Sequence, residues 1–130
     1  MKCKQLQSLI YYGESKRIEF KQMPCEGVYK TICAFLNTDG GNLLIGVDDN
    51  GNVTGFKPST KDIEAYHDAI SIWSTDHIRE EIIHVHGRSV WVIHIEPMRE
   101  TNHSSAIWKG DKYVRIGNST RRVCISTKSR

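Results

Sequence analysis

Apolar residues follow two different periods along the chain, and each period predicts one kind of element. Residues 18–22 alternate apolar with polar side chains, which is the pattern of a half-buried strand. Residues 26–37 carry apolar side chains at helical spacing, and the Asp39-Gly40-Gly41 turn that follows predicts the end of that helix. We also expect a short helix over residues 4–12 and a buried strand over residues 42–47.

Turn and capping residues divide the middle of the chain. Asn50-Gly51 is the strongest two-residue turn signal, and it predicts a hairpin between the preceding strand and a second strand at residues 52–56. Ser59 followed by Asp62 resembles a capping box, which opens a further predicted helix. One apolar stripe of that helix, which we assign to the core, consists of Ile63, Tyr66, Ile70 and Trp73.

Hairpins dominate the second half of the sequence. Residues 81–86 and 89–96 predict two strands joined at Gly87-Arg88, and residues 106–108 and 113–116 flank a basic turn. Because strands outnumber helices and hairpins link most of them, we expect an α+β fold with a mainly antiparallel sheet and two principal helices. With 130 residues, of which 38% are hydrophobic, the chain suits a single domain that spans residues 1–130.

The sequence bears on the cellular location of the protein, on its disulfides and on a zinc site. No apolar run approaches the roughly 20 residues of a bilayer span, and no secretion signal begins the chain, so we expect an intracellular, cytoplasmic protein without a membrane partner. The four cysteines show no CxxC pairing, which favours free thiols, with Cys33 in the core. His84, His86 and His94 could meet across two strands to bind zinc, but without a fourth ligand exposed histidines are the better interpretation.

Positive charge is concentrated at the C-terminal end. Residues 1–108 carry 11 Lys or Arg against 14 Asp or Glu, whereas residues 109–130 carry 7 against 1. Such a cluster attracts phosphates, although a solvated basic tail, expected over residues 123–130, accounts for it equally well. The residues we expect to contact nucleic acid are Lys109, Lys112, Arg115, Arg121 and Arg122. Trp108 and Tyr113 could stack on unpaired bases, but cross-strand packing within the hairpin is the better interpretation of both.

Four carboxylates near the predicted strands form the other candidate site. Glu14, Glu19 and the Asp48-Asp49 pair supply oxygen ligands of the kind that Mg²⁺ or Mn²⁺ prefers, and Lys21 shares the strand face of Glu19. On spacing alone, solvated surface acids are the better interpretation. The sequence has no GxxxxGK[ST] phosphate loop and no dinucleotide fingerprint, so we expect no nucleotide cofactor.

Three motifs, in order, are GESKRIEFK, ICAFLNTDGGNLLIGVDDNGNVTGF and KYVRIGNSTRR. Together they resemble the Schlafen-type AlbA-like domain over residues 13–122. The resemblance implies a nucleic-acid-binding α+β domain and, by analogy with the animal Schlafen proteins, a metal-dependent endoribonuclease acting on transfer and ribosomal RNA. The implied catalytic and metal-binding acids are Glu14, Glu19 and either Asp48 or Asp49, with Lys21 beside them.

The resemblance leaves the function open between two classes. One is the Mg²⁺- or Mn²⁺-dependent endoribonuclease, and the other is a non-catalytic regulatory module that binds DNA or RNA through the basic C-terminal hairpin. The animal nucleases join two such lobes, whereas this chain contains one. A homodimer or a second Schlafen-like lobe is therefore an expected partner.

Overall fold

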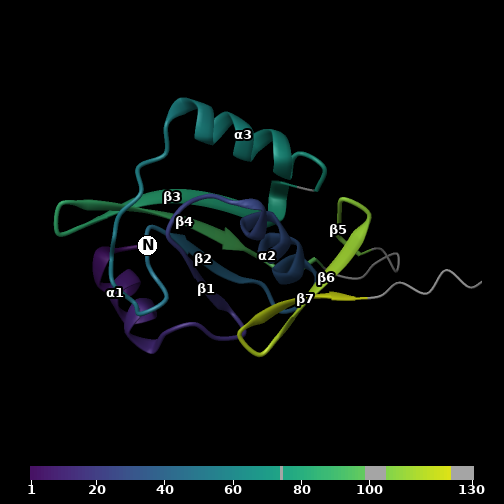
Figure 1. Ribbon diagram of the computed structural model, residues 1–130, viewed down its shortest axis with the longest axis horizontal. Coiled ribbons are helices and arrows are strands. Elements are labelled where there is room, and N and C mark those ends of the chain that lie inside the picture. The colour runs from purple at the N-terminus through teal and green to yellow at the C-terminus, as the bar shows by residue number, and fades with distance from the viewer. Residues whose placement is uncertain (74, 99–104, 124–130) are drawn as a thin grey trace, which may run out of the picture.

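A computed structural model describes residues 1–73, 75–98 and 105–123 (Figure 1). Within these ranges the helices are α1 (Cys3–Tyr12), α2 (Glu26–Asn37), α3 (Thr60–Ile70) and the short 3-10 helix η1 (Thr75–His77). The strands are β1 (Ile18–Lys21), β2 (Gly41–Ile45), β3 (Ile78–Val85), β4 (Arg88–Ile95), β5 (Ile107–Trp108), β6 (Asp111–Ile116) and β7 (Ser119–Val123). The basic tail predicted over residues 123–130 lies outside the described residues except for Val123.

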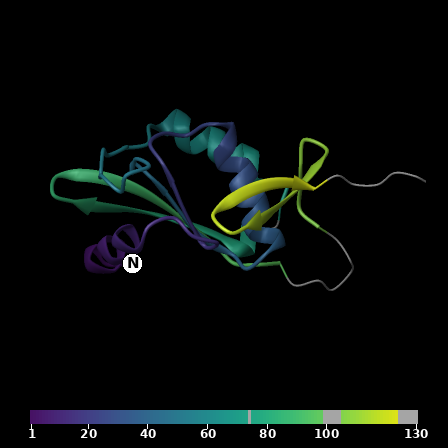
Figure 2. The ribbon, with the colours of Figure 1, turned by 60° about the horizontal axis from the view of Figure 1, so that its bottom comes forward.

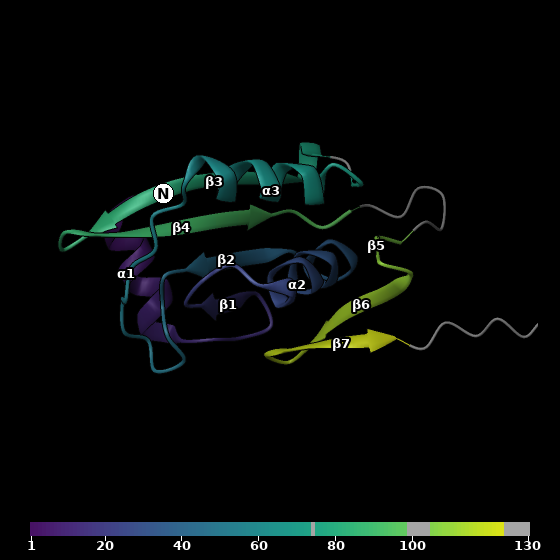
Figure 3. The same ribbon diagram turned by 45° about the horizontal axis from the view of Figure 1, so that its top comes forward.

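The strands form two sheets. The first has the order β1-β2-β4-β3, in which β1 pairs with β2 in parallel and the other neighbours are antiparallel (Figure 3). The second is the antiparallel sheet β5-β6-β7. The predicted α+β class with mainly antiparallel pairing is confirmed, although the strands divide into two sheets and one pair is parallel. Helix α2 makes the parallel pair possible, because it carries the chain back between β1 and β2.

Helices cover both faces of the first sheet. In Figure 2, α1 lies on one side of it, and α2 and α3 lie on the other. The α2 side holds the larger core, where Phe35 and Ile32 of α2 pack with Trp91 of β4 and the second sheet adds Trp108. The α1 side holds a smaller core around Leu6 and Val92. Cys33 is buried as predicted, and burial raises the pKa of its thiol to about 11.

The second sheet is hydrogen-bonded to the C-terminal end of α2 through Asn37, the last residue of the helix, and Thr38, which follows it. The Asn37 side-chain amide donates to the carbonyl oxygens of Ala106, at 2.9 Å, and Tyr113, at 2.8 Å, while its oxygen accepts the Ala106 N–H at 2.7 Å. The Thr38 hydroxyl accepts the backbone N–H of Arg115 at 3.0 Å. Polar contacts at the end of α2 therefore fix the position of β5 and β6.

Local predictions succeeded where capping chemistry was strong. The Ser59 and Asp62 capping box is present, with the Ser59 hydroxyl accepting the Asp62 N–H at 3.1 Å. The helix that it opens ends at Ile70, so Trp73 reaches the core from beyond the helix. The sequence also missed β7, whose polar residues gave no strand pattern.

The predicted hairpin at Asn50-Gly51 is wrong in one respect. The turn forms, and its sides are joined by the isolated bridge between Val47 and Val53 and by the N–H groups of Thr54 and Gly55, which both donate to the Gly46 carbonyl at 2.9 Å. No strand covers residues 52–56. Gly46, at φ 115°, turns the chain just before the turn. The N–H of Phe56 then donates to Ser89 at 2.7 Å, so this segment packs against β4 and does not pair with β2.

The three histidines considered for zinc lie apart along the β3–β4 pair, and His84 and His86 are exposed whereas His94 is half-buried. His84 lies opposite Ser89 near the turn between β3 and β4, whereas His94 lies opposite Arg79 at the far end of the same pair. His86 lies in that turn with φ 49°.

In the part of the chain that the structure describes, no helix is long and apolar enough to cross a membrane.

Candidate nucleic-acid interface and acidic cluster

Glu14 and Glu19 meet at β1, the edge strand of the first sheet. Glu14 lies in the connection before β1, and its Oε2 atom accepts the N–H of Phe20 at 3.0 Å. Burial raises the pKa of Glu14, and the nearby charges of Glu19 and Asp49 raise it further, against the lowering effect of the Phe20 hydrogen bond. The charges of two carboxylates that are separated from Glu14 in the sequence therefore act on it.

The geometry separates the two aspartates that the sequence left as alternatives. Asp48 Oδ1 accepts the backbone N–H groups of Asn50, at 2.9 Å, and Asn52, at 2.8 Å. These bonds hold the turn together, and the one from Asn52 is the main cause of the lowered pKa of Asp48. Asp49 is exposed, and its charge is the one that reaches Glu14. Asp48 thus shapes the turn, which leaves Asp49 as the aspartate whose charge acts on Glu14; Glu14, Glu19 and Asp49 are called the acidic cluster below.

Glu19 is held by two cations from different parts of the chain. Its Oε1 atom accepts from Arg115 Nη1 at 2.6 Å, and its Oε2 atom lies 3.5 Å from Lys21 Nζ. The Arg115 side chain is 0% exposed and also donates to the carbonyl oxygens of Ser15 (2.9 Å), Lys16 (3.3 Å) and Ile18 (3.1 Å). The expectation that Arg115 contacts nucleic acid is therefore corrected, because its guanidinium is enclosed and used within the fold.

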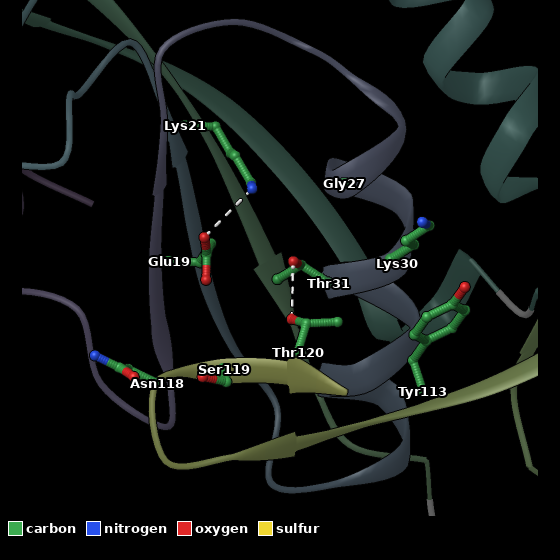
Figure 4. Close-up of a pocket in the computed structure, with 9 residues that line it drawn as sticks. All are labelled: Glu19, Lys21, Gly27, Lys30, Thr31, Tyr113, Asn118, Ser119 and Thr120. Carbon is green, nitrogen blue, oxygen red and sulfur yellow. Dashed lines mark hydrogen bonds and ion pairs between the residues drawn. The ribbon is translucent and has the colours of Figure 1, made fainter. Parts of the chain in front are cut away.

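A pocket of about 400 Å³ opens between β1, α2 and the hairpin of β6 and β7 (Figure 4). Its basic residues are Lys21 and Lys30, and its carboxylate is that of Glu19. The hydroxyls of Thr31 and Thr120 meet at 3.0 Å on one wall, and the remaining lining consists of Gly27, Tyr113, Asn118 and Ser119. Sequence reasoning missed Lys30, whose only signal was its polar position within the helical pattern of α2.

The remaining residues predicted to contact nucleic acid differ in exposure and in whether an acidic side chain lies beside them. Lys109 pairs with Glu26 at 3.2 Å, and Arg122 lies 3.8 Å from Asp111. Arg121 is exposed on β7, and Lys112 is half-buried on β6. The ring of Trp108 is buried against Tyr29 of α2, with centroids 5.0 Å apart, so it packs within the fold and is not free to stack on a base.

The acidic cluster fits a hard divalent cation in its donor chemistry. Glu14, Glu19 and Asp49 are oxygen donors, the ligands that a hard divalent cation prefers. The pKa of Glu14 is raised first by burial and then by the charges of Glu19 and Asp49, and a bound cation would counter all three effects. Among the residues that the structure describes, however, no three side chains of His, Cys, Asp or Glu are arranged to hold a metal ion. The metal-binding role of these acids stays a prediction.

Two solved structures have a similar fold. A protein from Corynebacterium diphtheriae superposes with a TM-score of 0.67 at 17% identity, covering 92% of this chain and 30% of that one. The N-terminal domain of an ATP-dependent DNA helicase RecG-related protein from Nitrosomonas europaea gives a TM-score of 0.55 at 20% identity, covering 100% and 98%. The chain thus spans less than a third of the Corynebacterium protein and almost all of the Nitrosomonas domain.

A family model matches the sequence directly. The model described as Schlafen, AlbA_2 matches residues 14–124, which include Glu14, β1, the acid-bearing turn and all three strands of the second sheet. This range agrees with the motifs that carried the resemblance in the sequence. The chain therefore belongs to the Schlafen AlbA_2 family.

Proposed function

We propose that this domain binds the phosphate backbone of nucleic acid in the pocket between β1, α2 and the β6–β7 hairpin. The observation that carries the proposal is the pair of ammonium groups, Lys21 and Lys30, that line this pocket together with hydroxyl groups. Glu19 lies among them, but the buried guanidinium of Arg115 offsets its charge. The pocket therefore presents net positive charge to a phosphate. Membership of the Schlafen AlbA_2 family supports the same ligand class.

The β6–β7 hairpin borders this pocket. Thr120 faces α2 and lines the pocket, whereas Arg121 and Lys112 alternate with the residues on that side and lie on the outer face of the hairpin. A nucleic-acid chain that leaves the pocket would reach them around the edge of β7. Arg122 and Lys109 contribute less, because acidic partners share their charge.

Replacing both pocket lysines is expected to weaken binding to a nucleic-acid oligonucleotide by tenfold or more. Each lysine that neutralises a phosphate releases counterions, so the slope of log affinity against log salt should fall by about 0.9 per lost contact on duplex DNA and about 0.7 on a single strand. Fluorescence polarisation at several salt concentrations measures both quantities for Lys21→Ala with Lys30→Ala.

The matched control is Lys57→Ala with Lys61→Ala, which removes the same charge from two exposed positions outside the pocket. It should change affinity by less than about twofold. Equal losses of affinity in the two double variants would mean that only net charge matters, and would contradict the proposal that the pocket binds the phosphate backbone.

Cleavage of RNA by the same site is a second candidate function, favoured by the cluster of Glu14, Glu19 and Asp49. These acids would hold Mg²⁺ or Mn²⁺, which when bound supplies charge that stabilises a phosphodiester undergoing attack by water. Lys21 lines the pocket beside Glu19, 3.5 Å from its Oε2 atom, and would hold the phosphate beside the cluster. A second copy of the chain or a second lobe would then complete the grip on a folded RNA.

Asp49→Asn and Glu14→Gln are expected to lower Mn²⁺-dependent cleavage of transfer RNA by at least tenfold, since even outer groups of metal sites contribute that much. Glu19→Ala is a poorer test, because it leaves the buried Arg115 guanidinium without its carboxylate. Mn²⁺ should also raise the melting temperature of the unchanged protein, and this rise should shrink in both variants.

Asp68→Asn on α3 is the control for these acid variants, because Asp68 is exposed and lies outside the cluster. Cleavage that survives both Asp49→Asn and Glu14→Gln would remove the acids from the reaction. Tight binding without any cleavage, and without an effect of Mn²⁺ on melting, would favour the non-catalytic regulatory module.

A further inference from the structure

The outer face of α1 carries two aromatic side chains in water. Tyr11 is 88% exposed and Tyr12 is 80% exposed, and their rings meet edge to face with centroids 6.0 Å apart. The opposite face of α1 packs Leu6 and its apolar neighbours into the smaller core. The two tyrosines therefore contribute little to that packing, and their exposure calls for another explanation.

The tyrosines border the acidic cluster. A methyl group built at Gly51 would lie 3.7 Å from both the Cγ2 atom and the carbonyl oxygen of Ile10, so the turn that holds Asp49 packs against the last turn of α1. On the other side, Gly13 turns the chain with φ 86°, and Glu14 follows at once. The end of α1 thus lies between the two segments that supply Asp49 and Glu14.

A hollow of about 370 Å³ lies along this face of α1. It is lined by Lys4, Gln7, Ser8, Tyr11 and Tyr12, which recur at helical spacing. The lining offers aromatic surface, amide and hydroxyl hydrogen-bonding groups and one ammonium, and α1 contains no acidic residue. This combination suits a flat heteroaromatic ring that is attached to a phosphate.

We propose that Tyr11 and Tyr12 form a stacking platform for an unpaired nucleobase of the bound nucleic acid. The proposal rests on the nucleic-acid binding proposed above, and it adds that the ligand is single-stranded next to the acidic cluster. A base inside a duplex is already stacked on both faces and cannot lie on the tyrosine rings. The positive charge of Lys4 complements the phosphate that accompanies the base.

Tyr11→Ala with Tyr12→Ala is expected to lower affinity for a single-stranded 12-mer at least fivefold, since stacking on an aromatic side chain accounts for about 1–3 kcal/mol per base. Affinity for a hairpin duplex should stay within about twofold. The salt dependence of single-strand binding should also stay unchanged, because no phosphate contact is lost. Tyr11→Phe with Tyr12→Phe keeps both rings and should bind the 12-mer as the unchanged protein does.

Fluorescence polarisation with both oligonucleotides measures these affinities, and thermal unfolding checks that the exposed substitutions leave the fold intact. Unchanged single-strand affinity in the alanine variant, or equal losses on single strand and duplex, would overturn the platform. If the pocket lysine variants weaken binding and the alanine variant does not, only the platform fails. If the unchanged protein binds neither oligonucleotide at low salt, the proposed function fails and the platform fails with it.

Discussion

Arg115→Met is expected to lower the free energy of unfolding by about 3–5 kcal/mol, the range found when one partner of a buried ion pair is removed. The substitution leaves Glu19, whose side chain is only 13% exposed, with Lys21 alone at 3.5 Å. It also removes the donor from the carbonyl oxygens of Ser15, Lys16 and Ile18. Denaturant unfolding followed by circular dichroism measures the change.

Arg121→Met is the matched control for this prediction. Arg121 is exposed on β7, so the same substitution there should change stability by no more than about 0.5 kcal/mol. Arg115→Lys should fall between the two, because it keeps the charge but loses the forked geometry of the guanidinium. Equal stabilities of the two methionine variants would contradict the structural role given to Arg115.

Asn37→Ala is expected to destabilise the domain by roughly 2 kcal/mol or more, since each buried group left without a partner costs about 1–3 kcal/mol. The groups that lose their partner are the N–H of Ala106 and the carbonyl of Tyr113, whereas the Ala106 carbonyl keeps the Cys33 thiol at 3.3 Å. Because these bonds join α2 to β5 and β6, hydrogen exchange in the second sheet should accelerate more than exchange in β4.

Asn37→Asp sharpens the same experiment, because it keeps the shape and replaces the donor by an oxygen that faces two carbonyl oxygens. It should be at least as destabilising as the alanine variant at neutral pH. The control is Asn118→Ala at the exposed turn between β6 and β7, where no comparable loss is expected. Uniform acceleration of exchange in both sheets would mean that Asn37 supports the whole fold and not this junction.

The parts of the fold that depend on neighbouring residues could be predicted from the sequence. The helix over 26–37 and the Ser59 cap follow from local spacing and capping chemistry, and both are present. The parallel pairing of β1 with β2 could not be predicted in this way, because it depends on how α2 packs and not on a turn. The failed second strand of the Asn50-Gly51 hairpin has the same cause, since Phe56 bonds to Ser89, more than thirty residues away.

In the candidate site, too, local motifs could be predicted from the sequence, whereas contacts between distant residues could not. The acids were found by motif, and the turn bonds of Asp48 then explained why Asp49 is the one whose charge reaches Glu14. Because Arg115 lies in a basic stretch, its place in the sequence predicts a surface cation. Its burial depends on a carboxylate and three carbonyl groups from residues 15–19, and no local pattern contains that information.

The contact between Glu19 and Arg115 also limits how this domain can evolve. A lineage that no longer needed the acid could not simply replace it, because the guanidinium would remain enclosed without its carboxylate. Among the described residues, neither Glu14 nor Asp49 forms an ion pair with a buried cation. Loss of Glu19 therefore calls for a compensating substitution almost a hundred residues away, so this acid serves the stability of the fold whatever chemistry it also performs.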